Sequence, residues 1–552
     1  MSEFAQASTL TRICHFGVGR FHRAHEALYI HELITDYDAT DWAICGVCML
    51  PFDEPMFETL QTQRGVYTLV ERDNDGERVV RVNSIKEVLF GYKYPQKVFD
   101  KLSSTVNIKS IAGMGDKSGG GDDAEVDEVQ VVTITVTEAG YFFDPSTKRL
   151  DFSHPAILHD LQNNASSPKT IYGYLVYALY LRYVHHIVPF TVQSCDNIQG
   201  NGELMKALLL EFCRHDQLVL SNPDTQVIVD SRERAGFLAW LDEQVCFPNS
   251  MVDRITPAAS PSEVAYVKEV LNFADDRVPV TCEKYRQWVI EDIFSGGSQR
   301  RPPFERFPAS AGVSLVADVK PYEKMKVRLL NAGHSALGYA GYLAGFTTID
   351  AVASDPLFQS YLRRFFQEVE VTLDPLPDVD FRAYQASLIS RFSNRNIKDD
   401  ILRICKDGSA KIPGFILPTL QDVVALIQTS TATSNRSSSS SVLSYTCLCF
   451  VVASWIAFVV RAATVPQEQP DQRLLLDDPE RQRLMALVQQ GTSAGGASSV
   501  GDVGCMAHAF MSDRRLFGDL IDNTALVSLV QQHYRCITTQ GVLVAVQQLQ
   551  LI

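Results

Sequence analysis

Short apolar runs alternate with helical segments through the first half of this chain. The runs cover residues 12–16, 42–50, 131–142 and 187–197, and each one stops at a glycine, a proline or a polar turn. Apolar residues at helical spacing follow the first run, and the segment 170–186 before the last run is also typical of a helix. Strands that alternate with helices predict a parallel, doubly wound sheet.

The pattern changes near residue 280, where helical signals replace the strand signals. The segments 324–346, 355–373, 422–428 and 480–490 all favour helix. A chain of 552 residues is long enough for two to four domains. We therefore expect an α/β domain over residues 1–280 and a mainly α-helical domain over residues 281–552.

Three polar segments interrupt these patterns. Residues 113–128 are rich in glycine and acidic residues, residues 429–441 are rich in serine, and residues 491–499 are small and polar. Such segments have little apolar area to bury, so they predict exposed surface loops. Their role is not readable from the sequence.

The charge of the chain limits the class of partner. The formal net charge is −15 and the pI is near 5.3. A general nucleic-acid binder needs a basic surface to displace counterions, so we expect no nucleic acid as partner. The hydrophobic content of 46% predicts a sizeable packed core.

One uncharged stretch is long enough to be considered as a membrane span. Residues 442–460 carry no charge for 19 residues, which is long enough to span a bilayer. Polar residues dilute this run, however, and no second candidate span accompanies it. We expect a fully buried helix here, no membrane partner and, since residues 1–16 lack a long apolar stretch, no secretory signal.

The 12 cysteines are scattered, and Cys45 and Cys48 form the one CxxC pair. Both lie in a predicted strand, where residues three apart point to opposite faces, which suits neither chelation nor a disulfide. No second pair follows to complete a four-thiolate zinc site. The cysteines therefore predict reduced, buried thiols in a cytoplasmic protein without a metal site.

The first predicted strand leads into "FGVGRFHRAH", residues 16–25. Gly17 and Gly19 lie between a strand and a helix, where the backbone can approach a pyrophosphate. The third glycine of the usual dinucleotide fingerprint is missing, and Phe21 and His22 lie in that region instead. By itself the pair fits either a nucleotide loop or an ordinary tight turn.

A polar cluster, "SCDNIQGNG", follows the strand predicted at residues 187–197. The carboxyl ends of parallel strands are where α/β sheets bind ligands. Asn197 could donate a hydrogen bond to a substrate oxygen there, although an Asx-rich turn would have the same composition.

Lys326, Asn331 and His334 have the spacing K-x4-N-x2-H within an otherwise apolar helical segment. On a regular helix they lie at roughly 0°, 140° and 80°, so all three share one face. An amine, an amide and an imidazole together can move a proton and hold an oxygen. The alternative is a solvated helix face with incidental polar groups.

These segments together resemble the polyol-specific long-chain dehydrogenases, the mannitol 2-dehydrogenase family. The matching stretches appear in the family's order over residues 13 to about 420. They are "GVGRFHRAH" (17–25), "SCDNIQGNG" (194–202), "MVDRITP" (251–257), "CEKYRQWVIEDIF" (282–294), the Lys326–Asn331–His334 set and "RICKDGSAKIPGF" (403–415). The resemblance thins after residue 430.

The resemblance implies that residues 1–280 form a Rossmann-like dinucleotide-binding domain. Residues 281–552 would then bind substrate and carry the catalytic groups, with the active site in the cleft between the domains. The cofactor-binding residues that it implies are Gly17, Val18, Gly19, Phe21 and Asp53.

In that loop, Phe21 would close over the pyrophosphate, and Arg23 and His25 would brace the turn. Asp53 or Glu54 after the second strand could bond a ribose 2′-hydroxyl and repel a 2′-phosphate, which favours NAD over NADP.

The family's chemistry is metal-free hydride transfer between a nicotinamide cofactor and C2 of a ketose or polyol, with D-mannitol and D-fructose favoured. The resemblance gives Lys326 the role of general base. A free lysine, with a pKa of about 10.4, is a poor base at pH 7, so this role needs burial or neighbouring positive charge. Asn197 and Asn331 would stabilise the reacting oxygen, His334 would orient substrate hydroxyls, and Glu323 would relay the proton.

Asp253, Arg403 and Lys411 are expected on the substrate side. Either cation could also serve a carboxylate, so a hexuronate reductase acting on fructuronate or tagaturonate remains an alternative. A non-catalytic sugar- or nucleotide-binding relative is a second alternative, and a zinc-dependent alcohol dehydrogenase is disfavoured because no ligand cluster is visible. A monomer or small homo-oligomer is expected; the natural substrate, direction and oligomeric state stay open.

Overall fold

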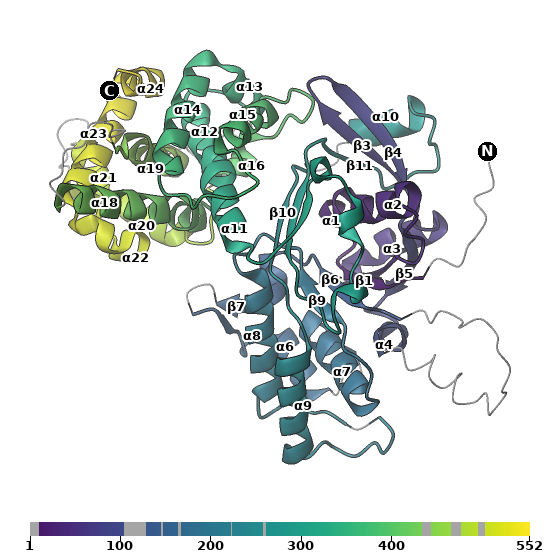
Figure 1. Cartoon of the computed structure of the whole chain (residues 1–552). Helices are drawn as coiled ribbons and strands as arrows, with labels where there is room; N and C mark the ends of the chain where they lie inside the picture. The colour runs from purple at the N-terminus through teal and green to yellow at the C-terminus, as the bar shows by residue number, and fades with distance from the viewer. Residues whose placement is uncertain are drawn as a thin grey trace, which may run out of the picture. The chain divides into compact units, whose positions relative to one another are not determined.

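The computed structural model describes residues 10–103, 128–144, 147–163, 167–221, 223–257, 261–432, 443–464, 476–494 and 503–551 (Figure 1). The chain divides into two compact units, Met1–Lys320 and Pro321–Ile552. Most of the loop expected at 113–128 and parts of those expected at 429–441 and 491–499 lie outside the described residues.

A five-stranded parallel sheet forms the centre of the first unit. Its order is β5 (Ile85–Phe90), β2 (Ile44–Cys48), β1 (Ile13–Phe16), β6 (Val131–Ile134) and β9 (Thr191–Ser194). All residues of β1, β2, β6 and β9 are buried, as expected for a parallel sheet with both faces covered. The predicted doubly wound sheet is confirmed.

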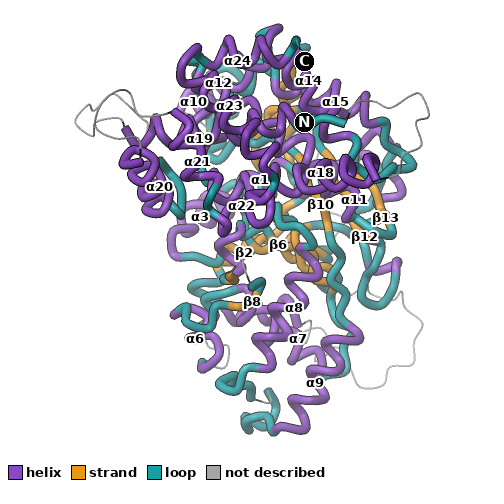
Figure 2. Tube along the Cα trace, turned by 90° about the vertical axis from the view of Figure 1, so that its left-hand side faces the viewer, coloured by secondary structure: helices purple, strands orange, loops and turns teal. Residues whose placement is uncertain are grey.

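Helices pack on this sheet and on one another. They are α1 (Arg20–Ala24), α2 (Glu26–Asp36), α3 (Glu54–Thr62), α4 (Pro95–Ser103), α6 (Pro155–Gln162), α7 (Ile171–Val184), α8 (Asn201–Arg214) and α9 (Ser231–Gln244). Figures 1 and 2 show α7, α8 and α9 side by side. The segment expected to be helical at 170–186 is α7, which begins where the Thr170 hydroxyl accepts a hydrogen bond from the amide of Gly173.

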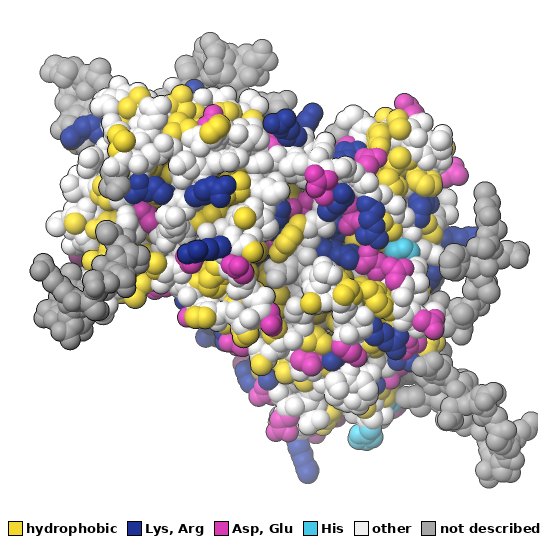
Figure 3. Space-filling view, turned by 45° about the horizontal axis from the view of Figure 1, so that its top comes forward, with side chains coloured by type: hydrophobic (Ala, Val, Ile, Leu, Met, Phe, Trp, Pro, Cys, Tyr) yellow, Lys and Arg dark blue, Asp and Glu magenta, His cyan; other side chains and the backbone are white. Residues whose placement is uncertain are grey.

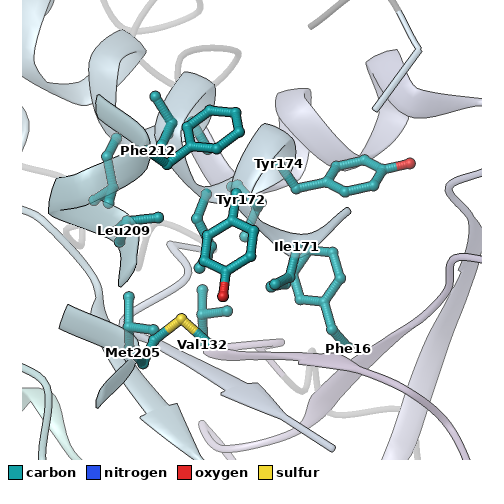
Figure 4. Close-up of a cluster of buried hydrophobic side chains, with 14 of the residues drawn as sticks. Phe16, Val132, Ile171, Tyr172, Tyr174, Met205, Leu209 and Phe212 are labelled. Carbon is teal, nitrogen blue, oxygen red and sulfur yellow. The ribbon is translucent and has the colours of Figure 1, made fainter. Parts of the chain in front are cut away.

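The core between α7, α8 and the sheet is built on aromatic side chains. Figure 4 shows Tyr172 of α7 at the centre of this cluster, between Phe212 of α8 and Val132 of β6. Its ring stacks on Phe212 with centroids 5.7 Å apart, and its buried hydroxyl donates to the carbonyl of Tyr141 at 2.7 Å. A buried tyrosine needs such a partner, which fixes the position of α7 on the sheet.

Three smaller sheets complete the first unit. One has the order β10 (Ser250–Asp253), β12 (Gln287–Glu291), β13 (Val313–Val316), and another has the order β11 (Val280–Glu283), β3 (Tyr67–Asp73), β4 (Gly76–Val82). A short pair joins β7 (Phe143–Asp144) to β8 (Arg149–Leu150), and α10 (Pro261–Glu269) lies before β11. Because β11, β12 and β13 pair with strands of the first unit, that unit extends to Lys320, beyond the boundary expected at residue 280.

The run at residues 131–142 is only partly a strand. β6 ends at Ile134, and Glu138–Tyr141 forms a 3₁₀ turn instead. Thr137 before this turn has φ 62°, which no extended strand adopts. The sheet therefore ends earlier than the apolar pattern indicates.

The second unit is helical, as expected for the C-terminal half. Its elements are α11 (Lys320–Lys326), the π-helical turn η6 (Val327–Asn331), α12 (Ala332–Leu343), α13 (Ile349–Ser354), α14 (Pro356–Glu370), α15 (Phe381–Phe392), α16 (Ile401–Cys405), α17 (Gly408–Lys411), the π-helical turn η7 (Ile412–Ile416), α18 (Leu417–Ala432), α19 (Thr446–Thr464), α20 (Arg481–Ala494), α21 (Val503–Met511), α22 (Arg514–Phe517), α23 (Thr524–Gln540) and α24 (Val542–Leu549).

Among the residues of this unit that the structure describes, two helical stretches are long and apolar enough to cross a membrane, judged by length and composition alone. They are Gly408–Thr429 and Thr446–Thr464. The second contains most of the uncharged run at 442–460 and is 72% buried, so it is a core helix, as predicted. The first, with 33% burial, was not expected, because Lys411 and Asp422 interrupt its apolar pattern.

All 12 cysteines are free thiols, as predicted; nine are buried and three, Cys246, Cys505 and Cys536, are partly exposed. On the face in Figure 3, basic and acidic side chains are interspersed among the described residues rather than gathered by sign.

Candidate active site

The turn after β1 requires glycine at one position and leaves space at the other. Gly17 has φ +97°, and a Cβ there would lie 2.0 Å from the carbonyl oxygen of Thr135. Gly19 has φ −78°, and the nearest atom to a Cβ there is the Gly17 oxygen at 3.8 Å. The fold itself therefore requires Gly17, whereas Gly19 faces open space into which a ligand could approach.

Arg23 and His25 brace this turn, as expected. The Arg23 side chain donates to the carbonyls of Gly19 and Val278, and His25 Nε2 lies 2.9 Å from the carbonyl of Gln287. Burial lowers the pKa of His25 to about 3, so His25 is neutral and donates through Nε2. Phe21 is partly buried and stacks on His25 at 5.1 Å, so packing accounts for its position and its expected contact with a pyrophosphate stays a prediction.

Asp53 follows β2 in a 3₁₀ turn, Pro51–Asp53. Its Oδ2 accepts hydrogen bonds from the amides of Met49 and Leu50, at 3.1 and 2.9 Å. These bonds hold the carboxylate at the carboxyl end of the strand, next along the sheet from the glycine turn. The position suits a partner for a ribose hydroxyl.

Asn197 is exposed and lies three residues past the end of β9. Its neighbour Asp196 is buried and accepts from the amides of Val136 and Thr137, both at 3.0 Å. Burial raises the pKa of Asp196, and these hydrogen bonds oppose that shift. Asp196 thus ties the loops after β6 and β9 together and fixes the segment that carries Asn197.

Asp253 ends β10 and is 3% exposed. Asn201 links its strand to the loop of Asn197, because the Asn201 amide donates to the carbonyls of Asp196 and Ser250 at 3.0 and 2.8 Å. Sequence reasoning missed both linking residues, Asp196 and Asn201, although both lie in the quoted "SCDNIQGNG" stretch. The structure therefore connects the segments that carry Asn197 and Asp253 within the first unit.

The second unit carries the lysine, amide and imidazole, and the expectation of a regular helix through them is wrong. Lys326 ends α11, the π turn η6 ends at Asn331, and His334 lies in α12. In an α-helix, residues five apart differ by roughly 140°, whereas a π turn bonds residue i to i+5 and brings them toward the same side. The π turn thus gives the K-x4-N spacing its common face.

The polar groups of this face are secluded. Glu323 and Lys326 are each 7% exposed. Asn331 Oδ1 is buried and has no hydrogen-bond partner among the described residues. The His334 ring packs against Phe392 with centroids 4.3 Å apart. A buried amide oxygen without a partner is costly, so it favours a site that a ligand hydroxyl completes.

A second π turn, η7, packs against η6 and follows Lys411 as η6 follows Lys326. Lys411 Nζ donates to the carbonyl of Ile404 at 3.1 Å. Arg403 Nε donates to Asp399 Oδ1 at 2.7 Å, and Arg403 Nη2 bonds the other oxygen of this carboxylate. Both expected substrate-side cations thus have partners within their own unit. π turns are frequent at functional sites, but hydrophobic periodicity does not reveal them.

The sequence showed no metal-ligand cluster, yet the described residues contain one group of suitable types, His15, His22 and Glu26, with ligand atoms within 4.8 Å of one another. The two histidine Nδ1 atoms lie 2.9 and 3.0 Å from the same oxygen of Glu26, which are hydrogen-bond distances. The carboxylate of Glu26 is therefore engaged by both histidines, while Nε2 of His22 is buried with no hydrogen-bond partner among the described residues.

The molecule thus joins a doubly wound sheet with a glycine turn after its first strand to a helical unit with a secluded lysine. Oxidoreductases that use a dinucleotide are built in this way, and the fold places the chain in that class. The chain belongs to the mannitol dehydrogenase family: the model for the mannitol dehydrogenase Rossmann domain matches residues 11–301, and the model for its C-terminal domain matches residues 318–538.

Individual relatives agree with this assignment. The mannitol 2-dehydrogenase of Aspergillus oryzae is 37% identical over 92% of this chain and 86% of its own length. A mannitol dehydrogenase of Saccharomyces cerevisiae is 38% identical over 74% of this chain and 72% of its own. The chain is therefore a polyol dehydrogenase, an oxidoreductase of CH–OH groups.

Two solved structures are similar in fold to this chain. The Pseudomonas fluorescens mannitol 2-dehydrogenase, in ternary complex with NAD and D-mannitol, has a TM-score of 0.73 and 31% identity, covering 99% of this chain and 96% of that one. A D-sorbitol dehydrogenase in substrate-free form has a TM-score of 0.74 and 27% identity, covering 98% and 95%.

Proposed function

We propose that this chain is an NAD-dependent mannitol 2-dehydrogenase that interconverts D-mannitol and D-fructose. The observation that carries the proposal is the buried, unpartnered Oδ1 of Asn331, which follows Lys326 by one π turn. An amine on this face can take an alcohol proton, and the unsatisfied amide oxygen can accept a hydrogen bond from a substrate hydroxyl. The likeness to a complex with NAD and D-mannitol supports the choice of cofactor and substrate.

The first unit fits a dinucleotide at the turn after β1. Gly19 leaves open space there, and the backbone amide of Val18 has no hydrogen-bond partner among the described residues. Asp53 at the end of β2 would bond a ribose hydroxyl and repel a 2′-phosphate, which favours NAD over NADP. A bound NAD would supply the hydride acceptor for oxidation of the alcohol carbon, and NADH would supply the hydride donor for reduction of the ketone.

The second unit supplies the proton chemistry. Lys326 takes the alcohol proton during oxidation and returns it during reduction. The side-chain NH₂ of Asn331 would donate to the reacting oxygen and stabilise its developing negative charge, and Asn197 would donate a hydrogen bond to a substrate oxygen. His334 orients the remaining hydroxyls, and Glu323, one turn before Lys326 on α11, passes the proton toward solvent. Asp253 binds a substrate hydroxyl.

Arg403 gives a reason to prefer a neutral polyol over a hexuronate. A carboxylate substrate needs a cation that is not already neutralised. Two bonds join Arg403 to Asp399, and Lys411 is bonded to the Ile404 carbonyl. Because Asp399 already balances the charge of Arg403, this arrangement favours a polyol and ketose pair, and Lys411, which donates to an uncharged carbonyl, would serve a far hydroxyl.

A panel of ketones tests the substrate. NADH oxidation is measured with fructose, fructuronate, tagaturonate and xylulose, and kcat/KM is compared. We expect fructose to give the highest value. A hexuronate that exceeded fructose tenfold would replace the proposal by hexuronate reduction, and NADH binding without turnover of any ketone would indicate a binding relative.

We further propose that the reaction needs no metal. In the one described group of metal-ligand types, both histidines already hydrogen-bond to the carboxylate of Glu26 through Nδ1. Activity should survive EDTA. Loss of activity that zinc restores would contradict this. The free thiols also support a reducing, cytoplasmic location.

A further inference from the structure

A buried polar cluster lies beneath the glycine turn and has no role in the chemistry above. His15, His22, Glu26 and Thr133 are each at most 1% exposed. They come from β1, α1, α2 and β6. An acid in the core of a domain is costly unless it is paired and hydrogen-bonded, so its partners are informative.

Glu26 is the centre of this cluster. Its Oε2 lies 2.9 Å from Nδ1 of His15 and 3.0 Å from Nδ1 of His22, and the hydroxyl of Thr133 donates to its Oε1 at 2.9 Å. Burial alone would raise the pKa of Glu26, but the two imidazoles hold it well below its usual range. Burial lowers the pKa of His22 to about 4, so His22 is a neutral donor to an anionic Glu26.

His15 faces an acceptor on each side of its ring. Nδ1 faces Glu26, and Nε2 lies 3.1 Å from the carbonyl oxygen of Gly17. Thr133, 2.8 Å from Nδ1, has given its single hydrogen to Glu26 and so can only accept from His15. A neutral imidazole has one N–H, whereas the imidazolium donates from both nitrogens. His15 and Glu26 therefore form a buried ion pair of opposite charges.

Through Nε2, this pair reaches the glycine turn. The carbonyl of Gly17 accepts from His15 and also from the amide of Gly19 at 2.6 Å. In a planar trans peptide, the N–H of the next residue points away from the carbonyl. Holding the Gly17 carbonyl toward His15 therefore turns the Val18 amide away from this cluster, where it has no partner among the described residues.

We propose that Glu26 is a positioning residue for the dinucleotide turn, acting through His15 and the Gly17 carbonyl on the Val18 amide. The inference rests on the proposed function, in which this turn binds the phosphates of NAD. An amide held in place before binding gives a tighter complex, because the turn need not reorganise when the anion arrives. An uncharged residue 26 would leave His15 without the anion that holds its second proton.

The direct test is the dissociation constant of NADH, measured by fluorescence titration of the full chain. Glu26→Gln should raise it about tenfold or more, the usual effect of losing a hydrogen bond to a charged group. Glu26→Asp keeps the charge and should recover part of the affinity. The matched control is Glu32→Gln on the same helix, which removes a buried acid that pairs with Arg78 and Arg286 instead. It should change the NADH constant less than about twofold.

Two further variants separate positioning from general loss of structure. In a His15→Gln background, Glu26→Gln should raise the NADH dissociation constant little further, because the hydrogen bond from His15 to the Gly17 carbonyl is already lost. If Glu26→Gln does not fold, the milder Thr133→Val takes its place. It removes one hydrogen-bond donor to Glu26 and should weaken NADH binding about threefold. At saturating NADH, the KM for fructose should stay within about twofold of the parent in each folded variant.

NADH binding by a folded Glu26→Gln chain as tight as that of the parent would overturn the inference and leave the proposed function standing. Equal weakening by Glu32→Gln would also overturn it, because the effect would then follow any buried acid of α2. A parent chain that bound no NADH would instead remove the proposed function, and the inference with it.

Discussion

Arg328 and Asp422 form an ion pair, with 2.7 Å between Nη1 and Oδ2, that joins the π turn after Lys326 to helix α18. The two π turns pack together beside this pair. The pair therefore helps to fix the π turn that places Lys326 and Asn331 on the same face of this helical segment.

Breaking this pair should affect turnover more than stability. Since Asp422 is 45% exposed, we expect Asp422→Asn to cost less than about 1 kcal/mol of unfolding free energy. We expect kcat to fall severalfold, because the turn is less firmly held. The matched control is Asp374→Asn, which removes an exposed pair with Lys324 on α11 and should leave kcat unchanged. Equal effects on kcat would contradict this role.

Alanine should reduce fold stability at one glycine of the turn and NADH affinity at the other. Gly17→Ala places a Cβ against the Thr135 carbonyl at a left-handed φ, so it should destabilise the fold by about 1–3 kcal/mol or more. Gly19→Ala meets open space and should leave Tm nearly unchanged while it weakens NADH binding. Thermal unfolding and NADH titration of both variants check this. Unchanged NADH binding by Gly19→Ala would remove the turn from the cofactor site.

Asp53 should set the preference between the two nicotinamide cofactors. The parent should use NADH with higher kcat/KM than NADPH, because a carboxylate repels a 2′-phosphate. Asp53→Ser should reduce the ratio by about tenfold, the effect of roughly 1.4 kcal/mol. Glu54→Gln is the control, since Glu54 lies 3.8 Å from Lys93 at the surface. If Glu54→Gln alone changes the ratio, the acid that selects the cofactor has been misassigned.

Lys326→Ala should remove a general-base contribution of roughly 10²–10⁴-fold in kcat and leave NADH binding nearly intact. Small primary amines should restore part of the activity, and the pH profile of polyol oxidation should lose one ionisation. Lys324→Ala should be mild, because Lys324 pairs with Asp374 at the surface. A severe Lys324→Ala with a benign Lys326→Ala would show that the motif is out of register.

Buried His533 should make stability fall as the pH falls. Burial lowers its pKa to about 4 from the ordinary 6.5, so between these values the unfolded chain binds a proton that the folded chain does not. This residue should therefore cost about 2 kcal/mol between pH 7 and pH 5. In urea titrations, His533→Gln should lose less stability than the parent over this range. An equal loss would assign the effect to other groups.

The sequence predicted the features that local pattern controls. The strand into Gly17 and the buried helix expected at residues 442–460 follow from the apolar pattern, whereas the bracing by Arg23 and His25 was what the family resemblance implied. The π turn at Asn331 was not predicted, because one extra residue per turn barely alters an apolar pattern. The extent of the first unit was missed because β11 pairs with β3, about two hundred residues earlier in the chain.

The contacts of the Glu26 cluster at the candidate site could not be predicted from the sequence either. His15, His22 and Glu26 are near one another in the sequence, but Thr133 lies 107 residues beyond Glu26. Neither burial nor the direction of each ring nitrogen follows from the motif. The residue types of the turn were predictable, whereas the network beneath it required the parallel pairing of β1 with β6.

Each unit contains buried cysteines, so alkylation of its thiols would report when that unit unfolds. Seven thiols belong to the first unit and five to the second, and most are shielded in the native fold. Burial raises the pKa of Cys213 and Cys282 to about 12, which suppresses the reactive thiolate as well as blocking access. Timed alkylation followed by peptide mass mapping would therefore reveal which half of the enzyme opens first, without any engineered label.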